Sequence, residues 1–212
     1  MDVLTELQQA KLVAIMRGIH SDKVIETVVA MKKGGIYCCE VTFDQRSNDF
    51  SETLKSIELI IKTFGDEVLV GAGTVLTVEQ VDLAFKAGAA YIISPDTNPD
   101  VIKRTKELGM ISIPGAMTPT EISSAWNSGA DIVKVFPAGD LGTDYIKAIS
   151  APLSHVPLLA VGGVNTNNAR EFLDIGCVGL GIGSALANKK LIEAGKFDEI
   201  TKVAKEYIAA IS

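Results

Sequence analysis

Apolar and polar positions alternate along the chain in one repeated order. A short apolar run rich in valine and isoleucine is followed by Gly, Pro, Ser or Thr, and then by a stretch with apolar residues at helical spacing. The apolar runs predict eight strands, at residues 12–16, 36–43, 68–71, 91–94, 111–114, 132–136, 158–161 and 178–182. The helical stretches are predicted at residues 22–33, 49–64, 78–87, 98–108, 119–127, 144–149, 167–173 and 197–211.

This alternation predicts the fold class. Strands that are apolar on both faces and separated by helices are typical of a parallel sheet. Eight such units favour closure into a single-domain (β/α)₈ TIM barrel over residues 1–212, since barrels of this size are commonly one domain. Val3, Leu4 and Leu7 stand at helical spacing, and we expect a short N-terminal helix across the lower mouth of the barrel.

Composition excludes several classes of protein. The chain has 212 residues, of which 47% are hydrophobic, and its net charge of -6 argues against a general nucleic-acid binder. The chain start does not resemble a signal peptide, and no window reaches membrane-spanning length, so we expect a cytoplasmic protein with no membrane partner. Cys38, Cys39 and Cys177 fit neither a disulfide framework nor a metal motif, and the two histidines, His20 and His155, are too few for a histidine-rich site. No metal and no cofactor is expected.

The predicted barrel also locates the candidate site, because the C-terminal ends of the strands surround the active-site mouth of such barrels. Some residues at these positions can bind an anion or transfer a proton, and others form glycine turns. They are Arg17, Glu40, the segment 71–74, Ser94-Pro95, Pro114-Gly115, Lys134 with Phe136, Gly162-Gly163 and Gly183-Ser184.

Lys134 is the most informative of these residues. It stands inside the apolar run 131–137, where a permanent ammonium group would be poorly solvated. Burial lowers the pKa of a lysine, and the resulting free amine attacks ketones. The alternative is a lysine whose stem lies on apolar surface while its head reaches water. Glu40 stands in a similar run, 38–43, and is either an inert ion-pair partner or a general acid/base beside the amine.

Three other features predict binding of an anionic substrate. The planar fork of Arg17 suits a carboxylate or phosphate. The turns Gly162-Gly163 and Gly183-Ser184 follow the last two strands, where such barrels commonly hold phosphate, and we expect each to open a helix with free backbone N–H groups. The alternative is that these glycines only allow tight turns. Thr74, after a glycine-rich segment, is either a turn residue or a donor to a substrate oxygen.

Six segments in register resemble one known family. These are Glu40-Val41-Thr42, Gly71-Ala72-Gly73-Thr74-Val75, Ile93-Ser94-Pro95, Pro114-Gly115, Lys134-Val135-Phe136-Pro137-Ala138 and Gly162-Gly163-Val164. They are similar to the 2-keto-3-deoxy-6-phosphogluconate (KDPG) and 4-hydroxy-2-oxoglutarate aldolases over nearly the whole chain.

The resemblance implies an activity and an assembly. It implies a homotrimeric class I aldolase that, without a metal, splits a phosphorylated keto-deoxy sugar acid into pyruvate and glyceraldehyde 3-phosphate. Cleavage of 4-hydroxy-2-oxoglutarate to pyruvate and glyoxylate is a further expectation. By the same resemblance Lys134 forms the Schiff base and Glu40 is the acid/base. The pyruvate end would be lined by Thr74, Pro95 and Phe136, and the phosphate would be held by Gly162, Gly163, Gly183 and Ser184.

The chain departs from the family pattern at two positions. Asp44 stands where well-known members have a carboxylate-binding arginine, so we expect Arg17 to bind the substrate carboxylate instead. Val161 stands where many members have a hydroxyl residue before the glycine pair, which favours the branch that cleaves the galactonate epimer.

Two other functions fit the same predicted fold. One is a metal-dependent phosphosugar epimerase or isomerase, which would need convergent His and Asp ligands that this sequence hardly offers. The other is a non-catalytic phosphosugar-binding barrel, in which Lys134 and Glu40 would form an inert pair.

Overall fold

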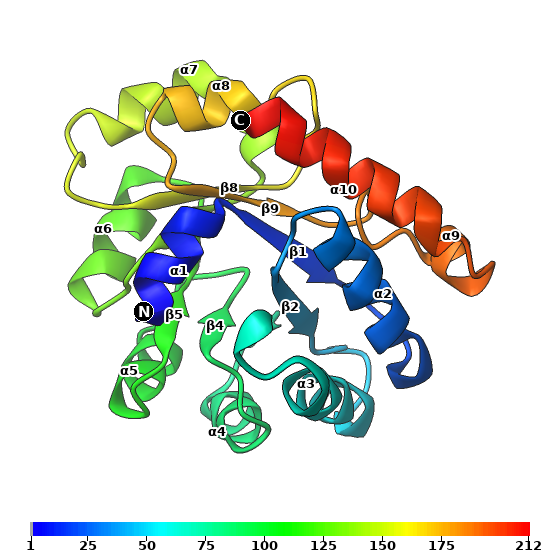
Figure 1. Ribbon diagram of the computed structural model, residues 1–212. Coiled ribbons are helices and arrows are strands. Elements are labelled where there is room, and N and C mark those ends of the chain that lie inside the picture. Colours follow the sequence, from blue (N-terminus) through cyan, green and yellow to red (C-terminus); the bar gives the residue numbers. More distant parts are fainter. Residues whose placement is uncertain (1) are drawn as a thin grey trace.

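The computed structural model describes residues 2–212, which form a parallel β-barrel surrounded by helices (Figure 1). The strands are β1 (Leu12–Met16), β2 (Cys38–Thr42), β3 (Leu69–Gly73), β4 (Tyr91–Ile93), β5 (Ile111–Ile113), β6 (Gly115–Ala116), β7 (Val133–Val135), β8 (Leu158–Val161) and β9 (Gly179–Ile182). The helices before β5 are α1 (Val3–Ala10), α2 (Ser21–Lys33), α3 (Ser51–Phe64), the 3₁₀ turn η1 (Gly65–Glu67), α4 (Val78–Lys86) and α5 (Pro99–Glu107). The later helices are α6 (Pro119–Asn127), α7 (Ala138–Ser150), α8 (Ala169–Asp174), α9 (Lys189–Glu193) and α10 (Phe197–Ile211).

The predicted barrel is confirmed, and its fifth strand differs from the prediction. The sheet order is β5-β4-β3-β2-β1-β9-β8-β7-β6, and every pairing within it is parallel. The predicted strand 111–114 appears as β5 and β6, which are separated by Pro114. Proline has no N–H to donate to a ladder, so the strand is interrupted there. Its first part pairs with β4 and its second part with β7, and in this way it closes the barrel.

The apolar side chains form two layers, as expected for such a barrel. A larger cluster lies between the strands and the outer helices. A smaller one fills the barrel interior and includes Tyr91, Ile113 and Leu159. Leu7 of α1 belongs to this inner cluster. Figure 1 shows α1 lying across the barrel, as predicted for the N-terminal helix, so α1 covers one end and the site must open at the other.

Two elements after β7 differ from the predictions. The predicted helix 144–149 is longer in the structure, where α7 begins at Ala138 and has a kink at Gly142 with φ of 80°. The glycine interrupts the helical spacing, and this hid the first turn of α7 from the pattern. Helix α9 was not predicted, because its five residues, Lys189–Glu193, are too few to show a period.

The third strand also extends further than predicted. Residues 71–73 belong to β3 rather than to a turn. A Cβ on Gly71 would lie 2.2 Å from the Tyr91 ring, and a Cβ on Gly73 would lie 2.6 Å from the Glu40 carboxyl group. These glycines are therefore required by close packing inside the barrel and not by a turn.

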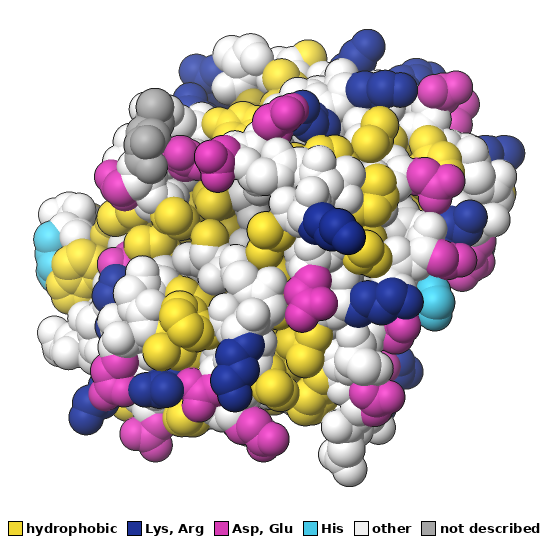
Figure 2. Space-filling model, turned by 60° about the horizontal axis from the view of Figure 1, so that its bottom comes forward, with side chains coloured by type: hydrophobic (Ala, Val, Ile, Leu, Met, Phe, Trp, Pro, Cys, Tyr) yellow, Lys and Arg dark blue, Asp and Glu magenta, His cyan; other side chains and the backbone are white. Residues whose placement is uncertain are grey.

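The surface carries charges of both signs. On the face shown in Figure 2, Lys and Arg side chains are interspersed with Asp and Glu, and small apolar patches lie between them. The larger exposed apolar side chains include Val78, Phe85 and Met117. Within residues 2–212, no helix is long and apolar enough to cross a membrane.

Candidate active site

Lys134 projects into the barrel from the middle of β7, and only 7% of it is exposed. Gly115 of β6 and Leu159 of β8 are its partners in the neighbouring strands. Its Nζ lies 5.1 Å from the centroid of the Phe136 ring. Burial lowers the pKa of this lysine, and the positive charge of Arg17 lowers it further, while Glu40 raises it. The net direction is downward, which increases the fraction of nucleophilic free amine.

Glu40 lies inside the same barrel, in the middle of β2, and is 2% exposed. Burial raises the pKa of its carboxyl group from 4.5 to about 7, against the opposing effects of Lys134 and Arg17. Its Oε2 has no hydrogen-bond partner among residues 2–212. The carboxyl group therefore keeps hydrogen-bonding capacity for a bound molecule. A pKa near 7 allows it both to take up and to release a proton at neutral pH.

Lys134 and Glu40 line one cavity of about 410 Å³ at the C-terminal end of the barrel. The structure brings most of the predicted site residues together here. Besides this pair, the predicted residues in its lining are Arg17, Pro95, Phe136, Gly162, Gly163, Gly183 and Ser184. The volume is within the range typical of small-molecule sites.

Thr74 does not line this cavity. It lines a neighbouring cavity of about 450 Å³, together with Arg17 and residues of the loop after β2. Its φ of 57° places it in the left-handed region, which is rare for a threonine. Gln45 holds this turn in place, since its Nε2 donates to the Thr74 carbonyl at 2.6 Å. Gln45 is in turn bound by the buried Gln80.

The turn Gly162-Gly163 is glycine for two structural reasons. Both residues have positive φ, at 85° and 72°. A Cβ on Gly162 would lie 2.9 Å from the Phe136 ring, and a Cβ on Gly163 would lie 2.9 Å from the Gly139 Cα. The Gly139 N–H donates to the Gly162 carbonyl at 2.7 Å. The turn is thereby packed against the start of α7.

The expectation that both glycine turns open helices was wrong. Helix α8 begins at Ala169, six positions after Gly163, because asparagine side chains order the intervening loop. Asn168 Nδ2 donates to the Gly163 carbonyl at 3.0 Å, and the Asn165 N–H donates to Asn168 Oδ1 at 2.7 Å. After Gly183 the chain makes one turn, in which the N–H groups of Leu186 and Ala187 donate to the Gly183 carbonyl, and α9 follows later.

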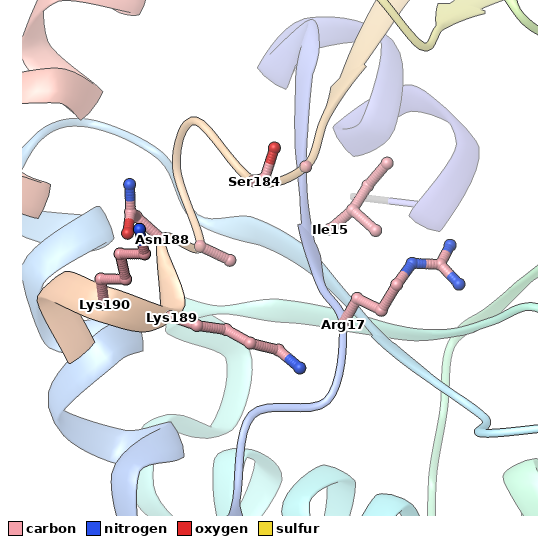
Figure 3. Close-up of a pocket in the computed structure, with 8 residues that line it drawn as sticks. Ile15, Arg17, Ser184, Asn188, Lys189 and Lys190 are labelled. Carbon is pink, nitrogen blue, oxygen red and sulfur yellow. The ribbon is translucent and has the colours of Figure 1, made fainter. Parts of the chain in front are cut away.

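Arg17 follows the end of β1 and lines three neighbouring cavities, including the one that contains Lys134. Among residues 2–212 no carboxylate forms an ion pair with it, whereas Arg46, Arg104 and Arg170 each bind at least one. Arg17, Ser184 and Lys189 line the first of these cavities together, and in Figure 3 the guanidinium of Arg17 points away from the other two side chains. An unpaired guanidinium at the cavity mouth is available to an anionic substrate.

Sequence reasoning missed several residues of the site. Ile15 and Tyr207 line the cavity of Lys134, and Asn165 lines it beside the glycine pair. Ile15 precedes Arg17 by two positions and points to the same side of its strand, so strand periodicity could have identified it. Tyr207 comes from α10, and no local signal connects it to the site.

The remaining candidates do not form a metal centre. No group of three or more His, Cys, Asp or Glu residues that could hold a metal ion occurs within residues 2–212. The three cysteines are buried and free, and burial raises the pKa of the Cys177 thiol to about 12. The thiols are therefore poor nucleophiles.

Comparison with known proteins gives consistent results. The family model described as KDPG and KHG aldolase matches residues 3–203. The chain is 39% identical, over 82% of its length and 83% of the relative, to the 2-dehydro-3-deoxy-6-phosphogalactonate aldolase of Escherichia coli K12. It is 30% identical, over 99% of its length and 96% of the relative, to the 2-dehydro-3-deoxy-phosphogluconate aldolase of Haemophilus influenzae.

A solved structure agrees with these relatives. The KDPG aldolase of Legionella pneumophila, crystallised with pyruvate captured at low pH as a covalent carbinolamine, superposes with a TM-score of 0.86. It is 28% identical to this chain and matches 95% of this chain and 96% of its own.

Proposed function

Since this chain belongs to the KDPG and KHG aldolase family, we propose that it cleaves 2-keto-3-deoxy-6-phosphogluconate or its galactonate epimer through a Schiff base on Lys134. The enzyme is a carbon–carbon lyase, and its products are pyruvate and glyceraldehyde 3-phosphate. The observation that carries the proposal is the buried amine of Lys134 in one cavity with the buried carboxyl group of Glu40. The carbinolamine captured in the Legionella relative supports the same chemistry here.

The reaction begins at the C2 ketone of the substrate. The free amine of Lys134 adds to C2, and the proton that the attacking nitrogen gives up passes to the former ketone oxygen to give a carbinolamine. Loss of water leaves a protonated imine. Glu40, in its protonated form, supplies the proton that makes the departing hydroxyl a water molecule. A carboxyl pKa of about 7 keeps both forms populated at neutral pH.

The C3–C4 bond then breaks. The electron pair moves toward the imine nitrogen and forms an enamine, while the proton of the C4 hydroxyl passes to Glu40. C4 becomes the carbonyl carbon of glyceraldehyde 3-phosphate, which leaves. Glu40 returns the proton to C3, and water hydrolyses the resulting protonated imine to pyruvate and the free amine of Lys134, while the released proton restores the protonated form of Glu40. Protons and electrons balance without an external oxidant or reductant.

The remaining residues hold the substrate. Arg17, assisted by Thr74 in the adjoining cavity, binds the C1 carboxylate. Pro95 and Phe136 cover the pyruvate end, and the edge of the Phe136 ring lies against Gly162. The phosphate is bound by backbone N–H groups of the two glycine turns. The residues of these turns are Gly162, Gly163, Gly183 and Ser184.

Cleavage of 4-hydroxy-2-oxoglutarate to pyruvate and glyoxylate is a further proposed activity. It needs the same imine and the same bond cleavage, and a carboxylate takes the place of the phosphate. The family model covers both activities in its description.

The assembly and the cellular setting are also proposals. We propose a cytoplasmic homotrimer in which residues 1–212 form a single domain without a bound cofactor. Exposed apolar side chains such as Phe85 and Met117 support association. Light scattering on the purified protein tests the trimer, which should have three times the chain mass of 22.5 kDa.

The proposed function is tested by coupling pyruvate release to lactate dehydrogenase, with each epimer as substrate. The wild type should release pyruvate from at least one epimer, before and after treatment with EDTA. Lys134→Ala should release none, while its circular dichroism spectrum remains that of a folded protein. Activity that EDTA removes and added metal restores would instead support a metal-dependent barrel, and no release from either epimer would support a binding protein.

A further inference from the structure

Lys189 is the first residue of α9, outside the barrel strands. Its side chain nevertheless lines a cavity together with Arg17 and Ser184. It extends toward β1 and Arg17 in Figure 3. A Cβ on Gly18 would lie 2.7 Å from Lys189 Nζ, so the ammonium group rests on the Gly18 backbone. Gly18 has a positive φ of 61° and no side chain, and this leaves the space that the lysine occupies. The cation is therefore held next to the end of β1.

Lys189 shares a cavity with the turn that is proposed to bind phosphate. This cavity of about 620 Å³ is lined by Gly183, Ser184 and Lys189, and it also includes Arg17. The same glycine, serine and arginine line the cavity of Lys134. The two cavities thus meet at the Gly183-Ser184 turn, with Lys134 on the inner side and Lys189 on the outer side.

The charge of Lys189 is not neutralised by the protein. Among residues 2–212 it forms no ion pair, unlike Lys32 and Lys106, which bind Glu67 and Asp131. Asp44 lies close enough for Lys189 to lower its pKa. The Asp44 carboxylate, however, already accepts two hydrogen bonds from the Arg46 guanidinium, at 2.9 and 2.8 Å. Lys189 therefore remains available to a ligand.

A cation beside these turns would strengthen the binding of a phosphate group, because it adds charge attraction to the backbone hydrogen bonds. A phosphomonoester carries about 1.5 to 2 negative charges at neutral pH. The glycine turns offer N–H groups but no charge, and Arg17 is assigned to the substrate carboxylate. We propose that Lys189 is a specificity-determining residue that binds the substrate phosphate from the outer side of the Gly183-Ser184 turn. This inference rests on the proposed aldolase function and deepens it.

The test uses aldol addition, in which the aldehyde can be offered with or without its phosphate. Pyruvate is added to D-glyceraldehyde 3-phosphate or to D-glyceraldehyde by the full-length wild type and by Lys189→Ala. The variant should raise the KM for the phosphorylated aldehyde about tenfold, the lower end of the range for a hydrogen bond to a charged group, because the lysine is exposed. The kcat/KM for glyceraldehyde and the KM for pyruvate should change less than about twofold.

Two control variants separate a specific contact between Lys189 and the phosphate from the general effect of removing one positive charge from the protein surface. Lys189→Arg keeps the charge and should recover most of the affinity for the phosphorylated aldehyde. Lys202→Ala removes the same charge from the exposed face of α10, outside the three cavities, and should behave as the wild type. Higher ionic strength should reduce the effect of Lys189→Ala, since salt screens an exposed charge.

The possible failures can be told apart. If the wild type adds pyruvate to the aldehydes but Lys189→Ala leaves the KM for glyceraldehyde 3-phosphate unchanged, the inference is overturned and the aldolase function stands. A rise in the KM for pyruvate with an unchanged preference between the aldehydes would place Lys189 at the carboxylate end, which also overturns it. A wild type that adds pyruvate to neither aldehyde contradicts the proposed function and the inference together.

Discussion

The carboxyl group of Glu40 lies directly over the Cα of Gly73, and a Cβ on this glycine would be 2.6 Å from the carboxyl carbon and from Oε2. Only glycine, which has no Cβ, leaves room for the carboxyl group at this position. The position of the proposed acid/base thus depends on a residue of the neighbouring strand β3, where Thr42 of β2 pairs with Gly73.

Gly73→Ala should impair catalysis more than stability. The added methyl group meets the end of a flexible side chain, so Glu40 can move away, and a displacement on the order of 1 Å can reduce turnover about 100-fold. The Tm should fall only slightly. The measurement is kcat together with thermal unfolding.

Gly71→Ala is the matched control on the same strand. Its methyl group would lie 2.2 Å from the rigid Tyr91 ring, which is fully buried. This variant should lose stability, by about 1 to 3 kcal/mol as for other overpacked cores. If Gly73→Ala retained full turnover, the fixed position of Glu40 would have no catalytic importance.

Glu40→Gln should keep the fold and lose turnover. The amide cannot exchange the proton that the carboxyl group moves, so kcat should fall by about 10² to 10⁴. Pyruvate should still form an imine on Lys134, more slowly than in the wild type. Steady-state kinetics and borohydride trapping check the two statements, and an unchanged kcat would assign Glu40 to charge pairing alone.

The same variant should be more stable than the wild type above neutral pH. Burial raises the folded-state pKa of Glu40 from 4.5 to about 7, so the folded protein binds more protons than the unfolded chain between these values. The unfolding free energy of the wild type should therefore fall as pH rises through this window, by about 3 kcal/mol relative to Glu40→Gln. Below about pH 4.5 the pH-dependent part of this difference should vanish. Denaturant unfolding at pH 4.5 and pH 8 measures the difference in unfolding free energy between the wild type and Glu40→Gln. If this difference were the same at both pH values, Glu40 would not titrate in this range.

Arg17→Ala should weaken binding at the carboxylate end. Within the described residues 2–212 no other guanidinium lines the cavity of Lys134, so the KM for pyruvate should rise about tenfold or more while the fold is unaffected. Arg170→Ala, which removes a surface guanidinium paired with Asp174, should leave the KM unchanged. A KM for pyruvate that is insensitive to Arg17 would mean that the carboxylate is bound elsewhere.

The strands and most of the helices could be predicted from the sequence, because they depend on the local spacing of apolar residues. The parallel strands and their order around the barrel follow from apolar runs and from the rules for βα units. The meeting of Lys134 and Glu40 in one cavity follows too, since both stand inside buried strands.

Other parts depend on contacts that no local pattern contains. The position of Thr74 is set by Gln45, which is distant in sequence, and Gln45 is in turn held by Gln80 of helix α4. The late start of α8 depends on the side-chain hydrogen bonds of Asn165 and Asn168. Asparagine side chains compete with helical hydrogen bonds in this way, and their effect depends on the final geometry.

Val161 should permit cleavage of both C4 epimers. It is buried beside Gly181 and lines the cavity of Lys134, where a hydroxyl residue would offer a hydrogen bond to a substrate oxygen. An apolar lining discriminates weakly, so the two specificity constants should differ by less than about a hundredfold. Val161→Thr should raise the preference for the gluconate epimer. Strict gluconate specificity of the wild type would show that this valine has no role in selection.

The proposed mechanism requires Lys134 to form an imine with the substrate ketone, and covalent trapping of this imine is a direct test. The protein is incubated with pyruvate, reduced with borohydride, digested and mapped by mass spectrometry. One reduced pyruvate adduct per chain is expected on the peptide that contains Lys134, together with loss of activity, and no adduct should form in Lys134→Ala. An adduct on another lysine, or none at all in an active enzyme, would rule out a Schiff base on Lys134.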